Sequence, residues 1–389
     1  MQEYKDRQDP FFNFINMYQA LFFDRTDYSY YLRDDKKGWS SFKYYPTYYI
    51  ADEDGEMETL EGTRVSPVNR MKDWQDPSYY EKDVDKDVRV LVDLYYETDD
   101  TPSFHNIVYL DIECEIGGAL TTEYIKSAPM KITSISLYDV NLKKFYCLIL
   151  DEKKQLKHVE EENKEIIPCD DEASLLSKFI DTWLVSDPTI VSGWNSEFFD
   201  IPYLVNRLNA LGFDTKNLSP WRMLEEKLVE FRGKEAQSYN IPGLAVLDYY
   251  QLYRKFSFAN HESYKLDYIA SVELGEKKVD YSEYGTLHGL YHSNFQKFIE
   301  YNIHDCVLVD KLDDKLKLIE QVMALAYDAK VNFTDTMTTV RSWDTIIHNY
   351  LLKSKTVVPP MKESRGFSSL VGGHVKDPQT GMHKWVVSY

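Results

Sequence analysis

The stretch from residue 106 to residue 211 constrains the fold most. Its hydrophobic residues follow a strand-like pattern in some segments and a helical spacing in others, in a definite order along the chain. Residues 106–113, Asn-Ile-Val-Tyr-Leu-Asp-Ile-Glu, form an apolar run typical of a buried strand. The segments that follow are predicted strands at 132–138 and 145–150, a helix at 171–185, a strand at 189–194 and a helix at 201–211. Three strands in succession, followed by helix, strand and helix, predict an α/β domain in layers.

The regions on either side differ in composition. Residues 1–102 are rich in tyrosine and acidic residues and contain turn-like clusters, so short strands and hairpins are predicted there. The polar run at 97–103 is interrupted by a proline and predicts a domain boundary. Downstream, residues 244–253 are predicted as a further strand, and residues 294–330 as a helix-rich stretch.

The length of 389 residues is sufficient for two or three ordinary domains. The four cysteines include no C-x-x-C pair, which argues against a disulfide framework and against a zinc cluster. No stretch approaches the roughly 18 consecutive apolar residues that a membrane span requires, and the first residues lack the pattern of a secretory signal. We therefore expect a cytoplasmic protein that does not associate with a membrane.

The charge balance bears on the binding partner. With 45 Lys and Arg against 64 Asp and Glu, the net charge is −19, which disfavours a tight, free-standing nucleic-acid binder. The 31 tyrosines are interpreted as packing at half-buried surfaces in preference to base stacking. A nucleic-acid ligand would therefore need a local site that supplies positive charge.

Two carboxylates lie at the end of the predicted strand 106–113. Asp111 and Glu113 are two residues apart, so both side chains project from the same face of the strand. Two neighbouring carboxylates repel each other unless a cation joins them. An ordinary polar strand edge has the same pattern, and this interpretation remains open for the pair alone.

Two further acids belong to other predicted elements. Asp200 lies at the turn into the helix 201–211, where it could equally be an acid favoured by the helix dipole. Tyr301 and Asp305 are four residues apart and therefore share one face of a predicted helix. Each feature is weak in isolation. The four acids together offer the hard oxygen ligands that suit Mg²⁺ or Mn²⁺, and a two-metal site of this kind can hydrolyse a phosphodiester.

The set Asp111-x-Glu113, Asp200 and Tyr301-x-x-x-Asp305 resembles the three exonuclease motifs of DEDD-type proofreading enzymes, in the subclass with tyrosine before the last acid. The flanking sequence is similar to family B DNA polymerases of T-even-type bacteriophages at residues 192–203, 246–249 and 255–258. This resemblance extends from about residue 105 to 310. It implies a ribonuclease H-like 3′-5′ exonuclease domain with a mixed sheet flanked by helices, a smaller α+β N-terminal domain, and the cytoplasm of an infected bacterial host.

The resemblance also implies roles for the site residues and a cofactor of two divalent metal ions, Mg²⁺ or Mn²⁺. Asp111 would bridge both ions, Glu113 and Asp305 would complete the first site, and Asp200 would hold the second. Tyr301 would orient the attacking water. The ions would supply the positive charge that crowded carboxylates need, and they would weaken the objection raised by the net charge.

The expected nucleic-acid contacts are Asn195, Phe199, Leu120, Arg232, Gly233 and Lys234. Phe199 could equally be a core residue, and Leu120 lies near the place where the phage relatives have a stacking aromatic. The stretch containing Gly233 resembles the tip of a hairpin that helps to separate primer from template, although an ordinary exposed turn fits the same residues.

By this resemblance the chain divides into an N-terminal domain at 1–102 completed by about 319–362, an exonuclease domain at 103–318, and a truncated approach to a polymerase palm at 363–389. The Asp-Thr-Asp polymerase motif does not occur, so no DNA synthesis is expected. The expected function is a metal-dependent 3′-5′ proofreading exonuclease that acts on a single-stranded 3′ end of DNA, with a companion polymerase chain or domain as a partner. The alternative is a module with an inactive nuclease site, whose N-terminal domain binds template or RNA.

Overall fold

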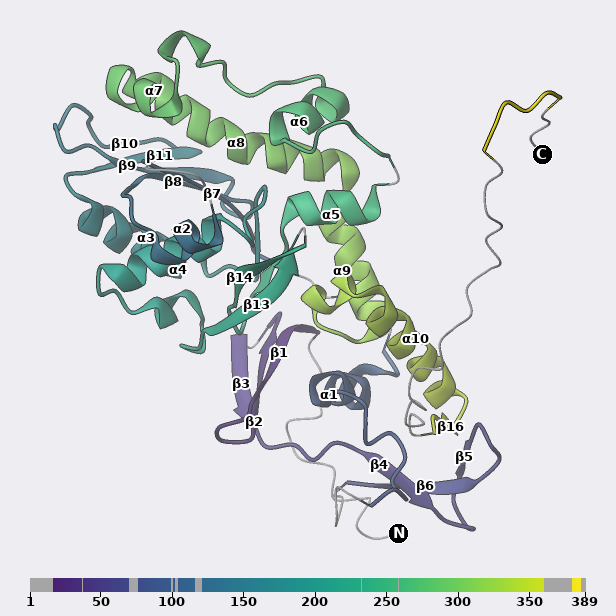
Figure 1. Ribbon diagram of the computed structural model, residues 1–389. Helices are drawn as coiled ribbons and strands as arrows, with labels where there is room; N and C mark the ends of the chain where they lie inside the picture. The colour runs from purple at the N-terminus through teal and green to yellow at the C-terminus, as the bar shows by residue number, and fades with distance from the viewer. Residues whose placement is uncertain are drawn as a thin grey trace.

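A computed structural model gives the fold and describes residues 17–36, 38–69, 76–98, 101, 104–115, 121–231, 233–257, 259–359 and 380–385. Its centre is a seven-stranded sheet in the order β10-β11-β9-β8-β7-β12-β15 (Figure 1). The strands are β7 (Ile107–Cys114), β8 (Ile132–Asp139), β9 (Lys144–Leu150), β10 (Val159–Glu160), β11 (Lys164–Cys169), β12 (Ile190–Ser192) and β15 (Ala245–Val246). The predicted strands and helices are present, but the order is not the predicted one, because the short helix α2 (Thr122–Ser127) lies between β7 and β8 and the strands β10 and β11 precede the first long helix.

The sheet is mixed. Strands β7, β8 and β9 form an antiparallel meander, with Asp111 opposite Ser136 and Glu113 opposite Ser134. Strand β12 runs parallel to both β7 and β15, and β11 runs parallel to β9. Parallel neighbours end at the same edge of a sheet, so the segments that follow β12 and β15 begin close together.

Helices cover both faces of the sheet. Helix α8 (Phe295–Leu316) lies on one face, and α3 (Glu172–Ser186) and α4 (Asp200–Ala210) lie on the other (Figure 1). The even-numbered residues of β7, including Leu110 and Ile112, belong to the core shared with α3 and α4. Because side chains alternate along a strand, Asp111 and Glu113 point to the face that α8 covers.

The N-terminal part consists of two small sheets and a helix. One sheet contains β1 (Tyr18–Asp24), β2 (Ser29–Asp34) and β3 (Gly38–Phe42), and the other contains β4 (Tyr48–Ala51), β5 (Met57–Thr59), β6 (Arg64–Val68) and β16 (Thr356–Val357). Helix α1 (Lys86–Tyr95) lies beside them, as do α9 (Leu318–Ala329) and α10 (Thr339–Lys353) (Figure 1). Strand β16 pairs with β5 in parallel, which brings the chain after α10 back to the N-terminal strands.

Buried polar contacts tie these late helices to the N-terminal part. The Tyr18 hydroxyl donates a hydrogen bond to the carbonyl of Val331 at 2.8 Å, and the buried Arg89 of α1 pairs with Glu81. Glu81 also lies 3.0 Å from His348 of α10. These contacts support our proposal that about residues 319–362 complete the N-terminal domain.

The remaining elements pack around the central sheet, its helices and the N-terminal part. They are the helices α2 (Thr122–Ser127), α5 (Tyr249–Phe256), α6 (Leu266–Leu274) and α7 (Leu287–Ser293), the 3-10 turns Thr215–Leu218, Ser282–Tyr284 and Phe333–Met337, and the hairpin strands β13 (Glu225–Phe231) and β14 (Lys234–Asn240). The single strand predicted at 244–253 is wrong beyond Val246, because Asp248 caps α5 and ends the extended segment. Among the described helices, none combines the length and the apolar character that a membrane crossing needs.

Candidate active site

Strand β7 carries the first two acids of the site. Asp111 and Glu113 are half-buried, and both face α8. One carboxylate oxygen from each, together with one from Asp305, forms a group in which all three atoms lie within 4.8 Å of one another. The pattern at the end of the predicted strand therefore marks a cluster of three acids from two elements.

The third predicted acid, Asp200, enters from the turn between β12 and α4. It is the first residue of α4 and is 3% exposed. Its Oδ1 accepts a hydrogen bond from the backbone N–H of Ile112 at 2.9 Å, which holds the carboxylate against the centre of β7. Ile112 lies between Asp111 and Glu113, so this bond places Asp200 beside the pair.

Helix α8 contributes the last two predicted residues. Tyr301 and Asp305 are separated by one helical turn and are 5% and 2% exposed. The face that carries them packs on the sheet, since the next residue, Cys306, has its Sγ 3.6 Å from the Ser136 carbonyl of β8. The structure thus brings all five predicted catalytic residues to one place.

Lys278 is a sixth member of the site, and the sequence interpretation missed it. Its Nζ donates hydrogen bonds to Asp305 Oδ2 at 2.6 Å and to the Tyr301 hydroxyl at 3.1 Å. It also lies 5.2 Å from the centre of the Tyr301 ring. Lys278 follows α6 in a charged segment with no periodic pattern, so only the three-dimensional arrangement reveals it.

The electrostatics of the site follow from the crowding of its acids. Burial, and then the charges of Asp305, Asp200 and Glu113, raise the pKa of Asp111 well above its usual range. Burial and Asp305 raise the pKa of Glu113 to about 8. Burial raises the pKa of Asp200 to about 7, although the Ile112 N–H opposes the shift. The site binds protons readily when no other cation is present.

The same residues fit divalent metal ions. Asp111 Oδ2 and Asp305 Oδ1 are buried and have no hydrogen-bond partner among the described residues, so both oxygens are available as ligands. An all-oxygen, carboxylate-rich set suits Mg²⁺ or Mn²⁺. A second group, His158, Glu160 and Glu165, is less suited, because Lys144 already pairs with both glutamates.

A cavity of about 420 Å³ opens beside the acids. Its lining includes Asp111, Lys278 and Tyr301 together with Trp194, Asn195, Tyr250 and Tyr264. Asn195 therefore lies where we predict a nucleic-acid contact. The Phe199 ring instead packs against Tyr203 of α4, with 5.8 Å between ring centres, next to the core.

The other predicted contacts lie away from this cavity or outside the described residues. Leu120 and Arg232 belong to the latter group. Gly233 is at the hairpin turn with φ of +74°, a conformation that favours glycine, and Lys234 begins β14. The predicted hairpin is present, whereas its contact with DNA stays a prediction.

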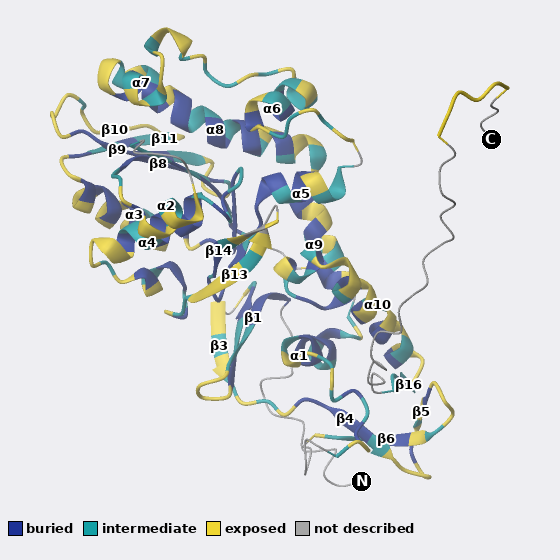
Figure 2. Ribbon diagram, viewed as in Figure 1, coloured by how far each residue is buried: buried dark blue, intermediate teal, exposed yellow. Residues whose placement is uncertain are grey.

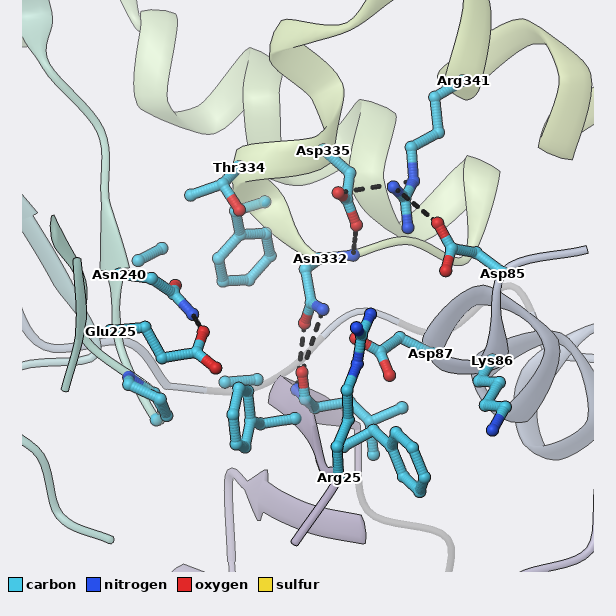
Figure 3. Close-up of a pocket in the computed structure, with 18 of the residues that line it drawn as sticks. Arg25, Asp85, Lys86, Asp87, Glu225, Asn240, Asn332, Thr334, Asp335 and Arg341 are labelled. Atoms are coloured by element: carbon cyan, nitrogen blue, oxygen red, sulfur yellow. Dashed lines mark hydrogen bonds and ion pairs between the residues drawn. The ribbon is translucent and has the colours of Figure 1, made fainter. Parts of the chain in front are cut away.

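A larger cavity, of about 1060 Å³, lies between β1, the start of α1, the base of the β13–β14 hairpin and the turn before α10, and it contains none of the clustered acids. Figure 3 shows hydrogen bonds and ion pairs between side chains that line this cavity, among them Arg341, Asp335 and Asp85. Arg341 pairs with Asp85 at 3.0 Å, and the Asn332 amide donates to the Leu21 carbonyl at 2.9 Å. Burial, Asp85 and Asp335 raise the pKa of Asp87 in this wall to about 6.

Sequence comparison assigns the class of this layered domain and its acid cluster. The sequence model of the family described as DNA polymerase family B, exonuclease domain, matches residues 64–269. This segment is more than half of the chain, and the chain therefore belongs to this family. Asp111, Glu113 and Asp200 lie inside the matched segment, and Tyr301 and Asp305 follow it.

Individual DNA polymerases are also similar to this chain in sequence. The chain is 37% identical over 225 residues to the DNA-directed DNA polymerase of Escherichia phage RB69 and 33% identical over 225 residues to that of Enterobacteria phage T4. Each alignment covers 57% of this chain and 25% of the relative. A DNA polymerase delta catalytic subunit from Dictyostelium discoideum is 25% identical over 266 residues, which is 65% of this chain and 23% of that protein. The chain thus matches about a quarter of the length of these polymerases.

Proposed function

We propose that the chain is a metal-dependent 3′-5′ exonuclease that removes nucleotides from single-stranded 3′ ends of DNA, as a proofreading domain does. The observation that carries this proposal is the meeting of four acids and Tyr301 from β7, α4 and α8, with Asp111 and Tyr301 in the lining of one cavity. Membership of the family B exonuclease domain and the DNA polymerases among its relatives support the choice of DNA.

The chain's own residues divide the chemical work. Asp111, Glu113 and Asp305 would hold one divalent ion, and Asp111 with Asp200 would hold the second. Two such ions supply an activated water and stabilise the departing oxygen of a phosphodiester. Asp200 and Asp305 are buried, so they are fixed before the substrate arrives.

Tyr301 and Lys278 complete the arrangement. Burial, and then the charge of Asp305, raise the pKa of the Tyr301 hydroxyl, so it stays protonated at neutral pH and can orient a water or a phosphate oxygen. The charge of Asp305 holds the pKa of Lys278 above its usual value, which keeps the ammonium positive although it is largely buried. We propose that this fixed cation also attracts the phosphate of the strand end.

The alternative, a nucleic-acid-binding module with an inactive site, receives less support. A vestigial site has no need of four acids and a tyrosine in one cluster, and buried carboxylates without a cation are costly. The net charge of −19 disfavours binding of either template DNA or RNA at a surface away from the metal site.

The deciding experiment is a time course with a single-stranded or 3′-recessed DNA oligonucleotide labelled at its 5′ end. With Mg²⁺ or Mn²⁺ we expect a ladder that shortens from the 3′ end, and with a chelator no ladder. A matched RNA strand should be degraded more slowly. Binding of DNA without any metal-dependent shortening would support the inactive module instead.

A Tyr301→Phe variant is expected to slow hydrolysis by about tenfold to a hundredfold while leaving metal binding unchanged, because an orienting hydroxyl contributes less than a metal ligand. Single-turnover rates and Mn²⁺ titrations measure the two effects separately. A Tyr281→Phe variant is the matched control, since Tyr281 packs edge-on against Tyr301 with 5.3 Å between ring centres. Equal losses in both variants would contradict a specific role for the Tyr301 hydroxyl.

We also propose that a polymerase part, as a companion chain or domain, docks on α10. Four large apolar side chains lie on one exposed face of this helix: Val340, Trp343, Ile347 and Tyr350, at 69%, 61%, 53% and 70% exposure. Figure 2 shows α10 at the margin of the molecule. The phage relatives are polymerases of which the alignments cover a quarter, so the remaining polymerase sequence of a relative is the binding partner to test, and Trp343→Lys should weaken its co-purification with this chain.

A further inference from the structure

We infer that Asp248 is a positioning residue that holds the wall of the cavity against which the strand end must lie; this inference rests on the proposed function. Asp248 is 2% exposed and lies one residue beyond Leu247, at the edge of the sheet where β12 also ends. It touches neither the acids nor the site for metal ions. Its carboxylate instead bridges two segments, the loop at residues 193–199 and the start of α5.

The bridge consists of three backbone N–H groups. Asp248 Oδ1 accepts hydrogen bonds from Asn195 at 2.9 Å and from Tyr250 at 3.0 Å, and Oδ2 accepts one from Glu197 at 3.3 Å. The Tyr250 bond caps α5, as many aspartates do. The bonds to Asn195 and Glu197 are additional to capping, since they cross to the loop at residues 193–199.

This loop has a conformation that requires support. Asn195 has φ of +70°, which a residue other than glycine adopts at a cost. Gly193 leaves no room for a side chain, because a Cβ there would lie 2.4 Å from the carbonyl oxygen of Leu110 in β7. The N–H of Tyr249 donates to the Gly193 carbonyl at 2.9 Å, so the loop is attached to α5 on both sides of Trp194.

The loop matters because of what lies at its two ends. Trp194 and Asn195 line the cavity beside Asp111 and Tyr301, and the loop continues directly into Asp200. Asp200 has its own support from the Ile112 N–H, whereas Asn195 depends on Asp248. Loss of the Asp248 carboxylate should therefore loosen the nucleotide wall and spare the metal ligands.

A second contact set shows that the loop is held from two directions. The Glu197 carboxylate accepts hydrogen bonds from Ser238 Oγ of β14 at 3.0 Å and from the side chain of Gln251 in α5. Glu197 therefore joins the loop to the base of the hairpin. Asp248 is buried in this network, so its substitution removes bonds that water cannot replace.

The test is the variant Asp248→Asn, which keeps the size of the side chain but offers one acceptor oxygen in place of two. We expect about tenfold weaker binding of a single-stranded 3′ end, measured with Ca²⁺ in place of Mg²⁺, and an unchanged Mn²⁺ affinity. The rate at saturating DNA should fall much less than the affinity. Asp171→Asn is the matched control, because Asp171 also caps a helix, α3, but on the opposite face of the sheet.

A double variant separates positioning from general loosening. If Asp248 acts through Asn195, the loss in DNA affinity from Asp248→Asn should be smaller in an Asn195→Ala background than in the wild type. Fully additive losses would overturn the inference, as would wild-type DNA affinity in a folded Asp248→Asn protein.

Hydrogen exchange of the wild-type protein provides a test that needs no variant. The amides of Asn195 and Glu197 should exchange slowly although they lie in a loop, and fast exchange would overturn the inference. DNA binding and exchange are both independent of turnover. A protein that binds DNA through a protected loop without cleaving it would contradict the proposed function and leave this inference standing.

Discussion

Replacing Asp111 with asparagine is expected to reduce 3′-end hydrolysis by roughly a thousandfold or more, and to raise the melting temperature of the metal-free protein. Both effects have the same origin. Asp111 faces the charges of Asp305, Asp200 and Glu113 at once, and we propose it as the acid that both metal ions would share. The neutral asparagine removes that ligand, and it also removes the free-energy cost of keeping a proton on this acid at neutral pH when no metal ion is bound.

The two readouts together distinguish a catalytic loss from a folding defect. Rates should be measured in single turnover with excess protein, and melting temperatures in a chelator. Asp280→Asn is the matched control, because Asp280 lies two residues after Lys278 but is exposed and accepts a hydrogen bond from the Ser282 N–H, away from the acids of the site. An active Asp111→Asn protein, or one that is less stable than the wild type without metal, would contradict the assignment of the site.

The position of the first acid pair could be predicted from the sequence because strand periodicity is strict. The apolar run at 107–112 fixes β7 in the sheet, and alternation then places Asp111 and Glu113 on the same face. Helical spacing likewise predicts that Tyr301 and Asp305 share a face. Neither pattern predicts that the strand face and the helix face meet. The resemblance to the exonuclease family implied that these residues form one site.

Residues whose role depends on loops could not be predicted in this way. Lys278 reaches Asp305 from a segment without periodicity, so no pattern precedes it. Asp248 was included in a predicted strand, because apolar and aromatic residues on both sides of it favour an extended segment. Capping ended that strand after Val246, and the same carboxylate became available to the loop at 193–199. At this position the tertiary hydrogen bonds of Asp248 determine the structure, and the local preference for an extended strand does not.

The arrangement around Lys278 explains how a strongly acidic protein can present a site for a polyanion. Lys278 provides one positive charge at the acids, and metal ions would provide the rest only where the strand end binds. The remaining surface can stay negative, which would disfavour binding along the length of duplex DNA. We therefore expect weak overall affinity for DNA together with a preference for ends.

The metal-free protein is expected to lose stability as the pH rises from about 4 to about 8, and divalent metal ions should restore it most at the upper end. Glu113 has an ordinary pKa of 4.5 and Asp200 one of 3.8, whereas burial in the folded protein raises them to about 8 and about 7. In this range the folded state keeps protons that the unfolded chain has released. The stabilisation is complete below the unfolded pKa values and disappears as the pH passes the folded ones.

Glu113 alone would account for a loss of folding free energy on the order of 3 kcal/mol. This figure already allows for screening by water, because the Glu113 side chain is only half-buried. Mg²⁺ or Mn²⁺ competes with these protons, so the gain in melting temperature on adding metal should be small near about pH 5 and several degrees near about pH 8. Thermal melts across this range, with metal and with chelator, measure the difference. Glu113→Gln should flatten the pH dependence without metal, which separates the site from the general repulsion of a chain with net charge −19. Metal stabilisation of the same size at both pH values would show that protons and metal ions do not compete for these acids.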